Sequence, residues 1–515
     1  MKEELFESTD KGFHRIREIK DEYIDPAILS KLTLSFVKKN LIMPLRKKDG
    51  HLIVAIAGHK SIFALGEVER IANLPVRPVF AEESQILEAI NRSFDRLSGS
   101  AQDVIEGMNV ESVESLSTVW EEPKDLIDLA DEGPIIKLIN SLLFQAVKDR
   151  ASDIHIEPYE KEVEVRYRVD GVLYPVLTPP RSIQEALVSR VKIMSGLDIA
   201  EKRLPQDGKI RLLVAGKDIY VRVSIIPTSY GERVVLRLLD RKGEIIQLSN
   251  LGLNPGQVSC LESLLSKPSG IILVTGPTGS GKTTTLYSAI SRVNSTSRNI
   301  ITVEDPVEYQ LKGIGQVHVN PKIGLTFASG LRSILRQDPD MIMIGEIRDR
   351  ETAEIAIQAS LTGHLVLSTL HTNDTAGAVT RLVDMGIEPF LVASSVSGVL
   401  AQRLVRVLCE KCREEYAPED EEARLFKARP QKLWRPAGCD KCLDTGYLGR
   451  TGIFEFLVPG PEMRPMILKN QDADTLKRSA VAKGMQTMME DGLEKAAEGI
   501  TSLEEVLRVT RDEAD

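Results

Sequence analysis

The fold of this chain is decided by Gly276-Pro277-Thr278-Gly279-Ser280-Gly281-Lys282-Thr283. The apolar run before it, Ile271 to Val274, predicts a buried strand, and Thr284 to Val293 after it predict a helix. A turn between a strand and a helix points successive backbone N–H groups and the helix N-terminus at one place, which favours a bound anion. The stretch therefore predicts a phosphate-binding P-loop. A glycine-rich loop that matches by chance is disfavoured, because strand, fixed positions and helix all occur in order.

The residue types within this loop indicate how it would hold ATP and Mg²⁺. Gly276, Gly279 and Gly281 suit a backbone that curls with no side chain between it and a phosphate. Lys282 would neutralise the β- and γ-phosphates, and the Thr283 hydroxyl would ligate Mg²⁺. The predicted nucleotide-binding residues are Gly276, Pro277, Thr278, Gly279, Ser280, Gly281, Lys282, Thr283 and Thr284.

Length and composition predict a soluble protein of several domains. At about 150 residues per domain, 515 residues correspond to three or four domains. The net charge of −9 argues against a general nucleic-acid binder, although a local basic groove stays open. Met1 to Asp25 is charged throughout and lacks the apolar centre of a signal peptide, and polar residues interrupt the longest apolar run, Phe390 to Leu400. We therefore expect a cytoplasmic protein that reaches a membrane only through partners.

Pattern changes along the chain predict its division into domains. The first 95 residues read as a small α/β module, either a docking domain or a structural cap, with strands at 52–56 and 76–79 and a helix at 62–72. A Ser-, Glu- and Asp-rich stretch without clear periodicity follows and predicts a flexible linker. A helix from Pro134 and strands that alternate polar and apolar residues then predict a compact α+β domain. The expected domains are 1–95, a linker over 96–132, 133–245, and a P-loop domain over 246–515 that ends in helices.

Polar clusters follow three apolar runs of the P-loop domain, at 300–303, 341–344 and 365–370. Chemistry in open parallel sheets gathers at the carboxyl ends of the strands. Glu346 is the best candidate to hold Mg²⁺ through water or to polarise the attacking water, and His371 would sense the γ-phosphate. Glu304 and Glu308 offer a second acidic group. Gly345 stands where P-loop proteins usually have Asp, so the ligation of Mg²⁺ is not straightforward.

Several arginines are candidates for contacts with phosphate. Arg332, Arg336 and Arg348 would offset phosphate charge, unless Arg348 simply pairs with its neighbour Asp349. Two further arginines, at positions 222 and 237, lie on predicted strands of the α+β domain, and such side chains are usually solvated.

The cysteines predict a metal centre. Cys409 and Cys412 form one Cys-x-x-Cys pair, and after 26 intervening residues Cys439 and Cys442 form another. Four thiolates in two close pairs suit tetrahedral Zn²⁺, with no open position and hence a structural role, in a subdomain over about 405–450. A redox dithiol is the alternative, but it does not need a second matching pair. Cys260, within a helical pattern, reads as a small buried hydrophobic residue.

The order of motifs resembles one family. GPTGSGKTTTLY, ITVEDPVE, RSILRQDPDMIMIGEIRD and LTGHLVLSTLHTND are similar to the Walker A, Asp box, Walker B and His box of the secretion and pilus-assembly ATPases. ASDIHIEP, RLPQDGK and the two cysteine pairs are similar as well. The resemblance covers about residues 130 to 510 and is weaker over the first hundred. We see no long Arg- and Gln-bearing repeat of the kind with which some pilus relatives bind a cyclic dinucleotide, so that ligand is not expected.

Within this family the layout looks most like the ATPase of type II secretion, with type IV pilus assembly as the close alternative. The resemblance implies a RecA-like motor domain, a PAS-like middle domain and a hexamer that assembles a pseudopilus. It implies roles for Lys282, Thr283, Glu346 and His371, and it implies that Arg222 and Arg237 reach the phosphates. Gly345 belongs to the family's own pattern and does not count against activity. The first domain would dock an inner-membrane platform protein, which would place the ATPase at the inner membrane as a peripheral protein.

Two rival functions remain open at the level of sequence. One is a nucleic-acid motor, which the charge of −9 and the lack of an aromatic and basic stripe oppose. The other is a scaffold that binds ATP without turning it over. Which acidic residue acts as general base is also open.

Overall fold

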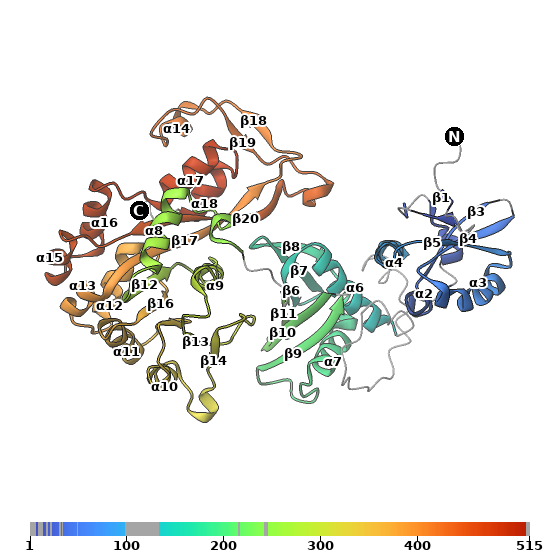
Figure 1. Ribbon diagram of the computed structural model, residues 1–515, viewed down its shortest axis with the longest axis horizontal. Helices are drawn as coiled ribbons and strands as arrows, with labels where there is room; N and C mark the ends of the chain where they lie inside the picture. Colours follow the sequence, from blue (N-terminus) through green and yellow to red (C-terminus); the bar gives the residue numbers. More distant parts are fainter. Residues whose placement is uncertain are drawn as a thin grey trace. The chain divides into compact units, whose positions relative to one another are not determined.

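A computed structural model describes the chain in two compact units, residues 1–242 and 243–515 (Figure 1). The described residues are 7–8, 14–16, 19–20, 23–29, 32, 34–48, 50–97, 133–214, 217–240 and 246–510. The predicted linker over 96–132 lies almost entirely outside them. Within the described part, every helix is too short or too polar to cross a lipid bilayer.

The first unit opens with a small α/β module. Its sheet has the order β1 (Glu7–Ser8), β2 (His14–Arg15), β5 (Val76–Phe80), β4 (His51–Ile56) and β3 (Ile42–Lys48). Its helices include α2 (Leu34–Asn40), α3 (Leu65–Ala72) and α4 (Glu83–Leu97). Val54, Val68 and Ile86 are fully buried between sheet and helices. Helix α3 begins later than predicted, because residues 59–64 form a 3₁₀ helix.

The second sheet of this unit is antiparallel and six-stranded. Its order is β8 (Val172–Leu177), β7 (Val163–Val169), β6 (Ala151–Pro158), β11 (Gly231–Asp240), β10 (Lys217–Thr228) and β9 (Gln206–Val214). Helices α6 (Pro134–Lys148) and α7 (Gln184–Ser195) share one buried core with it. The alternating side chains that predicted the strands put Val221 and Val223 in that core and Arg222 on the other face. The predicted turn at Asp170 and Gly171 joins β7 to β8 with positive φ at both residues, as a two-residue hairpin turn requires.

The second unit is built on a seven-stranded sheet whose strands are parallel except the last. In sheet order they are β14 (Gly315–His318), β13 (Ile300–Glu304), β15 (Met341–Ile344), β16 (Leu365–Leu370), β12 (Gly270–Thr275), β17 (Val396–Leu408) and β20 (Tyr447–Leu457). Successive residues of β12 alternate between two buried clusters, so both faces of the sheet are covered. This explains the continuous apolar runs, since a parallel strand buried on both faces has no polar side.

Helices cover the two faces of this sheet. The first cluster packs against α10 (Phe327–Ile334), α11 (Arg350–Leu361), α12 (Thr375–Asp384) and α13 (Pro389–Ser395), and the second against α8 (Pro255–Leu265) and α9 (Lys282–Val293). The predicted α/β fold with a parallel P-loop sheet is confirmed. Cys260 on α8 is partly exposed, so the prediction that it is buried was wrong. Its neighbours Leu261, Leu264 and Leu265 fill the buried side of the helix instead.

The chain after β17 forms a small two-stranded sheet and the predicted terminal helices. These elements are β18 (Glu414–Tyr416), β19 (Leu433–Arg435), α15 (Met463–Leu468), α16 (Ala473–Ala482), α17 (Met488–Ala497) and α18 (Leu503–Thr510). Leu433, Leu493 and Leu503 form a common buried cluster, which packs α17 and α18 against the small sheet. The two cysteine pairs lie between β17 and β20.

Candidate functional site

The predicted P-loop runs from the end of β12 to the first residue of α9. Gly276, Gly279 and Gly281 have φ values of 144°, 82° and 88°, a backbone conformation that side chains disfavour. A Cβ atom on Gly276 would lie 2.4 Å from the backbone oxygen of Gln402, and one on Gly281 would lie 2.8 Å from Nε2 of the same glutamine. Backbone conformation therefore favours glycine at both positions, and at Gly276 the backbone oxygen of Gln402 also leaves no space for a side chain.

Lys282 is held inside this loop. Its Nζ donates hydrogen bonds to the carbonyl oxygens of Gly276 at 2.7 Å and Pro277 at 2.9 Å. Burial lowers the pKa of Lys282 to about 8, and the negative charge of Glu346 opposes that shift. Both hydrogen-bond partners are neutral, so the ammonium carries a positive charge that a bound anion would offset.

The remaining polar groups of the loop fit a phosphate chain. The Ser280 hydroxyl is buried and has no hydrogen-bond partner among the described residues. The N-terminus of α9 receives no side-chain cap from Gly281, so its first backbone N–H groups are available to a ligand. Buried polar groups in proteins are nearly always hydrogen-bonded, and the phosphates of ATP would supply the acceptors.

Glu346 and His371 lie together at the carboxyl ends of neighbouring strands β15 and β16. His371 Nε2 is 3.3 Å from Oε2 of Glu346, and Arg348 contacts Oε1 at 2.7 Å. The Glu346 side chain is 13% exposed, so its charge is only partly screened, and it acts on Lys282 across the same edge of the sheet. The arrangement joins an acidic group, an imidazole and a cationic loop at one edge.

Arg332 and Arg336 have hydrogen-bond or ion-pair partners outside the P-loop. Arg332 is ion-paired with Glu351, and Arg336 donates to the carbonyl oxygen of Arg332 at 2.8 Å. Arg348 does not pair with Asp349, because Asp349 instead caps α11 by accepting the backbone N–H of Thr352 at 2.8 Å.

Glu304 has a different environment from Glu346. It is buried at the end of β13 and accepts hydrogen bonds from the Tyr287 hydroxyl, from Thr302 Oγ1 at 2.5 Å and from Gln316 Nε2 at 3.1 Å. Burial and the neighbouring Glu304 raise the pKa of Tyr287, so this tyrosine stays a neutral donor. Glu308 is partly buried, and its backbone N–H donates to the same hydroxyl at 3.3 Å. Both oxygens of Glu304 are thus engaged within the protein, which leaves Glu346 as the better-placed acid.

Arg222 and Arg237 lie in the first unit, directly opposite each other on β10 and β11. Arg237 Nε is 2.8 Å from Oδ1 of Asp153, which lies on the adjacent strand β6. Burial works to raise the pKa of Asp153, but the hydrogen bonds from Arg237 and Ser152 outweigh it and lower the pKa. The Arg237 side chain is 56% exposed, so it is anchored at one side and accessible at the other.

The four predicted cysteine ligands come together. Their sulfur atoms all lie within 4.8 Å of one another. Three pairs are 3.7 to 3.9 Å apart, close to the ~3.8 Å edge of a tetrahedron with Zn–S bonds of about 2.3 Å. Backbone N–H groups of Cys439 and Gly446 lie 3.2 Å from the Cys442 sulfur, a contact that favours a thiolate. The cluster fits Zn²⁺ in a closed structural site.

The sequence reasoning missed the residues that support the loops. Oε1 of Gln402 on β17 accepts a hydrogen bond of 2.6 Å from the Thr285 hydroxyl, directly behind the P-loop. Thr275, at the end of the P-loop strand, and Thr372, directly after His371, are joined by a hydrogen bond of 2.7 Å between their hydroxyls. Isolated Gln and Thr residues give no sequence signal, and only the strand pairing brings them together.

Comparison with known proteins gives consistent matches. Residues 128–508 match a family described as type II/IV secretion system protein, and residues 15–100 match the MshEN domain. The chain is 49% identical over 489 residues to the type II secretion system protein E of Pseudomonas aeruginosa, covering 94% of this chain and 97% of that one. It is 50% identical over 457 residues to the type II secretion system ATPase E of Vibrio cholerae, covering 88% and 91%.

Solved structures support the fold. The ATPase DotB of Legionella pneumophila aligns with a TM-score of 0.55 at 22% identity, over 77% of this chain and 99% of that one. The DotB of Yersinia pseudotuberculosis aligns similarly, with a TM-score of 0.55 at 21% identity over 77% and 97%. These likenesses concern the fold alone, and they agree with the RecA-like P-loop fold expected from the sequence.

Proposed function

This chain belongs to the type II/IV secretion system protein family, and from that membership we propose that it hydrolyses ATP to power assembly of a pseudopilus in type II protein secretion. The observation that most supports hydrolysis is the meeting of Lys282, Glu346 and His371 at one edge of the sheet. The high identity to type II secretion relatives over nearly the whole chain supports the assignment to secretion.

Different residues of the loop would bind the phosphates and Mg²⁺. Backbone N–H groups of the loop, other than Pro277, which has none, and the ammonium of Lys282 would hold the phosphates of ATP. Lys282 exchanges its bonds to two loop carbonyls for bonds to phosphate oxygens. Thr283 would hold Mg²⁺, which neutralises charge on the β- and γ-phosphates when bound.

We assign Glu346 as the carboxylate that acts on the attacking water. It accepts a proton or orients the water, and His371 and Arg348 fix its position through their contacts with its two oxygens. Lys282 carries positive charge next to the phosphoryl group, where negative charge must be stabilised in the transition state. Arg222 and Arg237 of the middle domain would add charge from a second domain, so hydrolysis would alter the contact between domains.

The remaining domains have proposed roles in assembly. Residues 1–95 would dock a cytoplasmic part of an inner-membrane platform protein, which keeps the ATPase at the inner membrane from the cytoplasmic side. Residues 96–132 link that module to the middle domain at 133–245. The motor domain at 246–515, braced by zinc on the four cysteines, would form a hexamer whose successive subunits change their interdomain angle.

Phosphate release by the full-length chain tests this proposal. Lys282→Ala should abolish ATP binding, and Glu346→Ala should abolish turnover while ATP still binds. Lys469→Ala removes an exposed lysine after α15 and should leave both measurements unchanged. Equal turnover in all variants, or bound ATP that no variant hydrolyses, would instead support a scaffold. Stimulation by DNA or RNA that salt abolishes would support a nucleic-acid motor.

Capture experiments distinguish type II secretion from type IV pilus assembly. The full-length chain, compared with a variant lacking residues 1–95, should retain a secretion platform protein that the truncated variant loses. Retention of a type IV pilus platform protein would assign the chain to pilus extension instead.

A further inference from the structure

Gln402 lies directly behind the P-loop. Strands β12 and β17 are parallel neighbours, and Thr275 is paired with Ala401. Gly276, where the loop begins, follows Thr275 in the chain, and Gln402 follows Ala401. The Gln402 side chain is 2% exposed, although glutamine is usually a surface residue.

This one residue reaches both ends of the loop. Its backbone oxygen occupies the space that a Cβ atom on Gly276 would need, and its Nε2 occupies the corresponding space at Gly281. Its Oε1 accepts a hydrogen bond of 2.6 Å from Thr285, which is buried in the first turn of α9. Gln402 therefore touches the start of the loop, its end and the helix that follows.

The loop needs such support from outside. Its three glycines adopt positive φ values and have no side chains with which to pack. Glycine also has the largest conformational freedom to lose when the loop is ordered. A neutral amide suits the position, because a carboxylate there would repel the phosphates that the loop is built to hold.

We propose that Gln402 is a positioning residue that holds the P-loop in its phosphate-binding curvature through Thr285, before nucleotide arrives. The inference rests on the proposed nucleotide binding and adds a residue outside the P-loop motif to that site. A preorganised loop loses less freedom on binding, so Gln402 should act mainly on nucleotide affinity. Its effect on the chemical step should be smaller, since it contacts no reacting atom.

The test measures ADP and ATP dissociation constants, KM and kcat for the full-length chain. Gln402→Ala should weaken nucleotide binding and raise KM about tenfold, with kcat changed by less than about threefold. Gln402→Glu, which keeps the shape, should weaken binding at least as much. Thr285→Ser should bind like wild type, and Thr285→Val should weaken binding.

A double variant separates positioning from a general loss of structure. The double variant Gln402→Ala with Thr285→Val should bind nucleotide no more weakly than the single variant with the lower affinity, because both substitutions remove the same contact. Gln257→Ala is the matched control, since Gln257 is also buried, but its Oε1 accepts the backbone N–H of Asn254 in the capping box of α8, away from the loop. It should lower the melting temperature without changing nucleotide affinity.

The outcomes distinguish this inference from the proposed function. If wild type binds no nucleotide, the proposed function fails. If wild type binds and Gln402→Ala and Gln402→Glu bind equally well, only the role of Gln402 is overturned. Additive losses in the double variant would likewise overturn it. If Gln402→Ala does not fold, Gln402→Glu and Thr285→Val carry the same test.

Discussion

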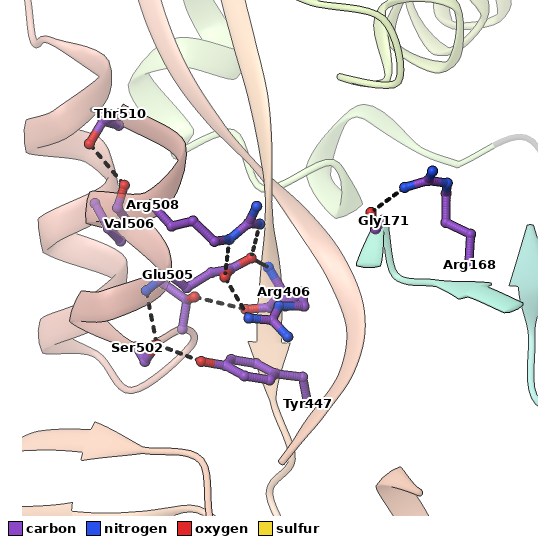
Figure 2. Close-up of polar contacts among 10 residues, drawn as sticks. Arg168, Gly171, Arg406, Tyr447, Ser502, Glu505, Val506, Arg508 and Thr510 are labelled. Atoms are coloured by element: carbon purple, nitrogen blue, oxygen red, sulfur yellow. Dashed lines mark hydrogen bonds and ion pairs between the residues drawn. The ribbon is translucent and has the colours of Figure 1, made fainter. Parts of the chain in front are cut away.

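Glu505 accepts two hydrogen bonds from Arg406, one from the guanidinium Nη2 at 2.8 Å and one from the backbone N–H at 3.1 Å (Figure 2). Arg508 adds two more at 2.7 and 2.8 Å. The Arg406 guanidinium lies 3.9 Å from the centre of the Tyr447 ring, and the Tyr447 hydroxyl contacts Ser502 at 2.7 Å. Helix α18 is thereby fixed to β17 and β20, the two strands that flank the cysteine cluster.

Replacing Glu505 with Gln should strongly destabilise the second unit. Glu505 is 1% exposed, and removing one partner of a buried ion pair costs about 3 kcal/mol or more. Urea denaturation at pH 7 measures the difference. Glu504→Gln, on the exposed side of the same helix, is the control and should stay near wild type. Equal midpoints for Glu505→Gln and wild type would contradict the prediction.

The same pair predicts a dependence on pH. Burial acts to raise the pKa of Glu505, but the hydrogen bonds from Arg508 and Arg406 outweigh it and lower the pKa to about 2. A lowered carboxyl pKa stabilises the fold above the pKa of the unfolded chain, about 4.3, and this stabilisation is lost as the pH falls toward 2. The gap between wild type and Glu505→Gln should therefore be constant near neutral pH and narrow below about pH 4. A gap that widens on acidification would count against this assignment.

Replacing Cys439 and Cys442 with Ser should remove bound zinc and destabilise the second unit. Two thiolates alone cannot complete a tetrahedral sulfur site. Metal analysis should find about one zinc ion per wild-type chain and almost none in the double variant. Cys260→Ser, which changes a partly exposed cysteine outside the cluster, should keep its zinc. Zinc retained without Cys439 and Cys442 would rule out the four-thiolate site.

Nucleotide affinity should fall as the pH rises above about 8. The free chain has a Lys282 pKa of about 8, because burial disfavours the ammonium more than Glu346 favours it. Bound phosphates favour the ammonium, so above pH 8 binding must take up a proton, and affinity should drop by up to about tenfold per pH unit. Below pH 8 this group contributes no pH dependence.

ADP titration between pH 7 and pH 9.5 measures this effect. Lys282→Arg is the control, because arginine stays protonated throughout that range and any remaining affinity should be nearly flat. A wild-type affinity that is equally flat would show that Lys282 does not titrate there.

The sequence predicted well those parts of the fold in which a local pattern coincides with burial. The runs at 300–303, 341–344 and 365–370 became central strands because both faces of a parallel sheet are covered. Strand β17 was missed, since Gln402 and Arg406 break its apolar pattern. Gln402 is buried and Arg406 is partly buried, and their partners Thr285 and Glu505 lie far away in the chain, outside any local window.

Strand β6 was missed for a related reason. Its sequence alternates Ile154 and Ile156 with Asp153, His155 and Glu157, a pattern of period two that is short and unusually acidic for a strand. The structure places it at the centre of its sheet, with Arg237 and Arg233 beside its carboxylates. The sequence also predicted the position of the glycine-rich loop and the grouping of the four cysteines, because their spacing along the chain is itself diagnostic.

Replacing Arg237 with Ala should reduce ATP turnover at least about tenfold, because the function proposed above assigns its charge to the transferred phosphoryl group. Arg237 is 56% exposed, so its removal leaves no cavity, but the buried Asp153 loses its closest cation and keeps Ser152 and the more distant Arg168, so some stability should be lost as well. Arg222→Ala, which changes the residue opposite in the strand pair, should behave in the same way. Arg211→Ala is the matched control, since Arg211 lies on the outer strand β9 and pairs with Asp218. Turnover of Arg237→Ala and Arg222→Ala equal to that of wild type, measured below the melting temperatures of both variants, would remove both arginines from the mechanism and with them the proposed coupling of hydrolysis to movement between domains.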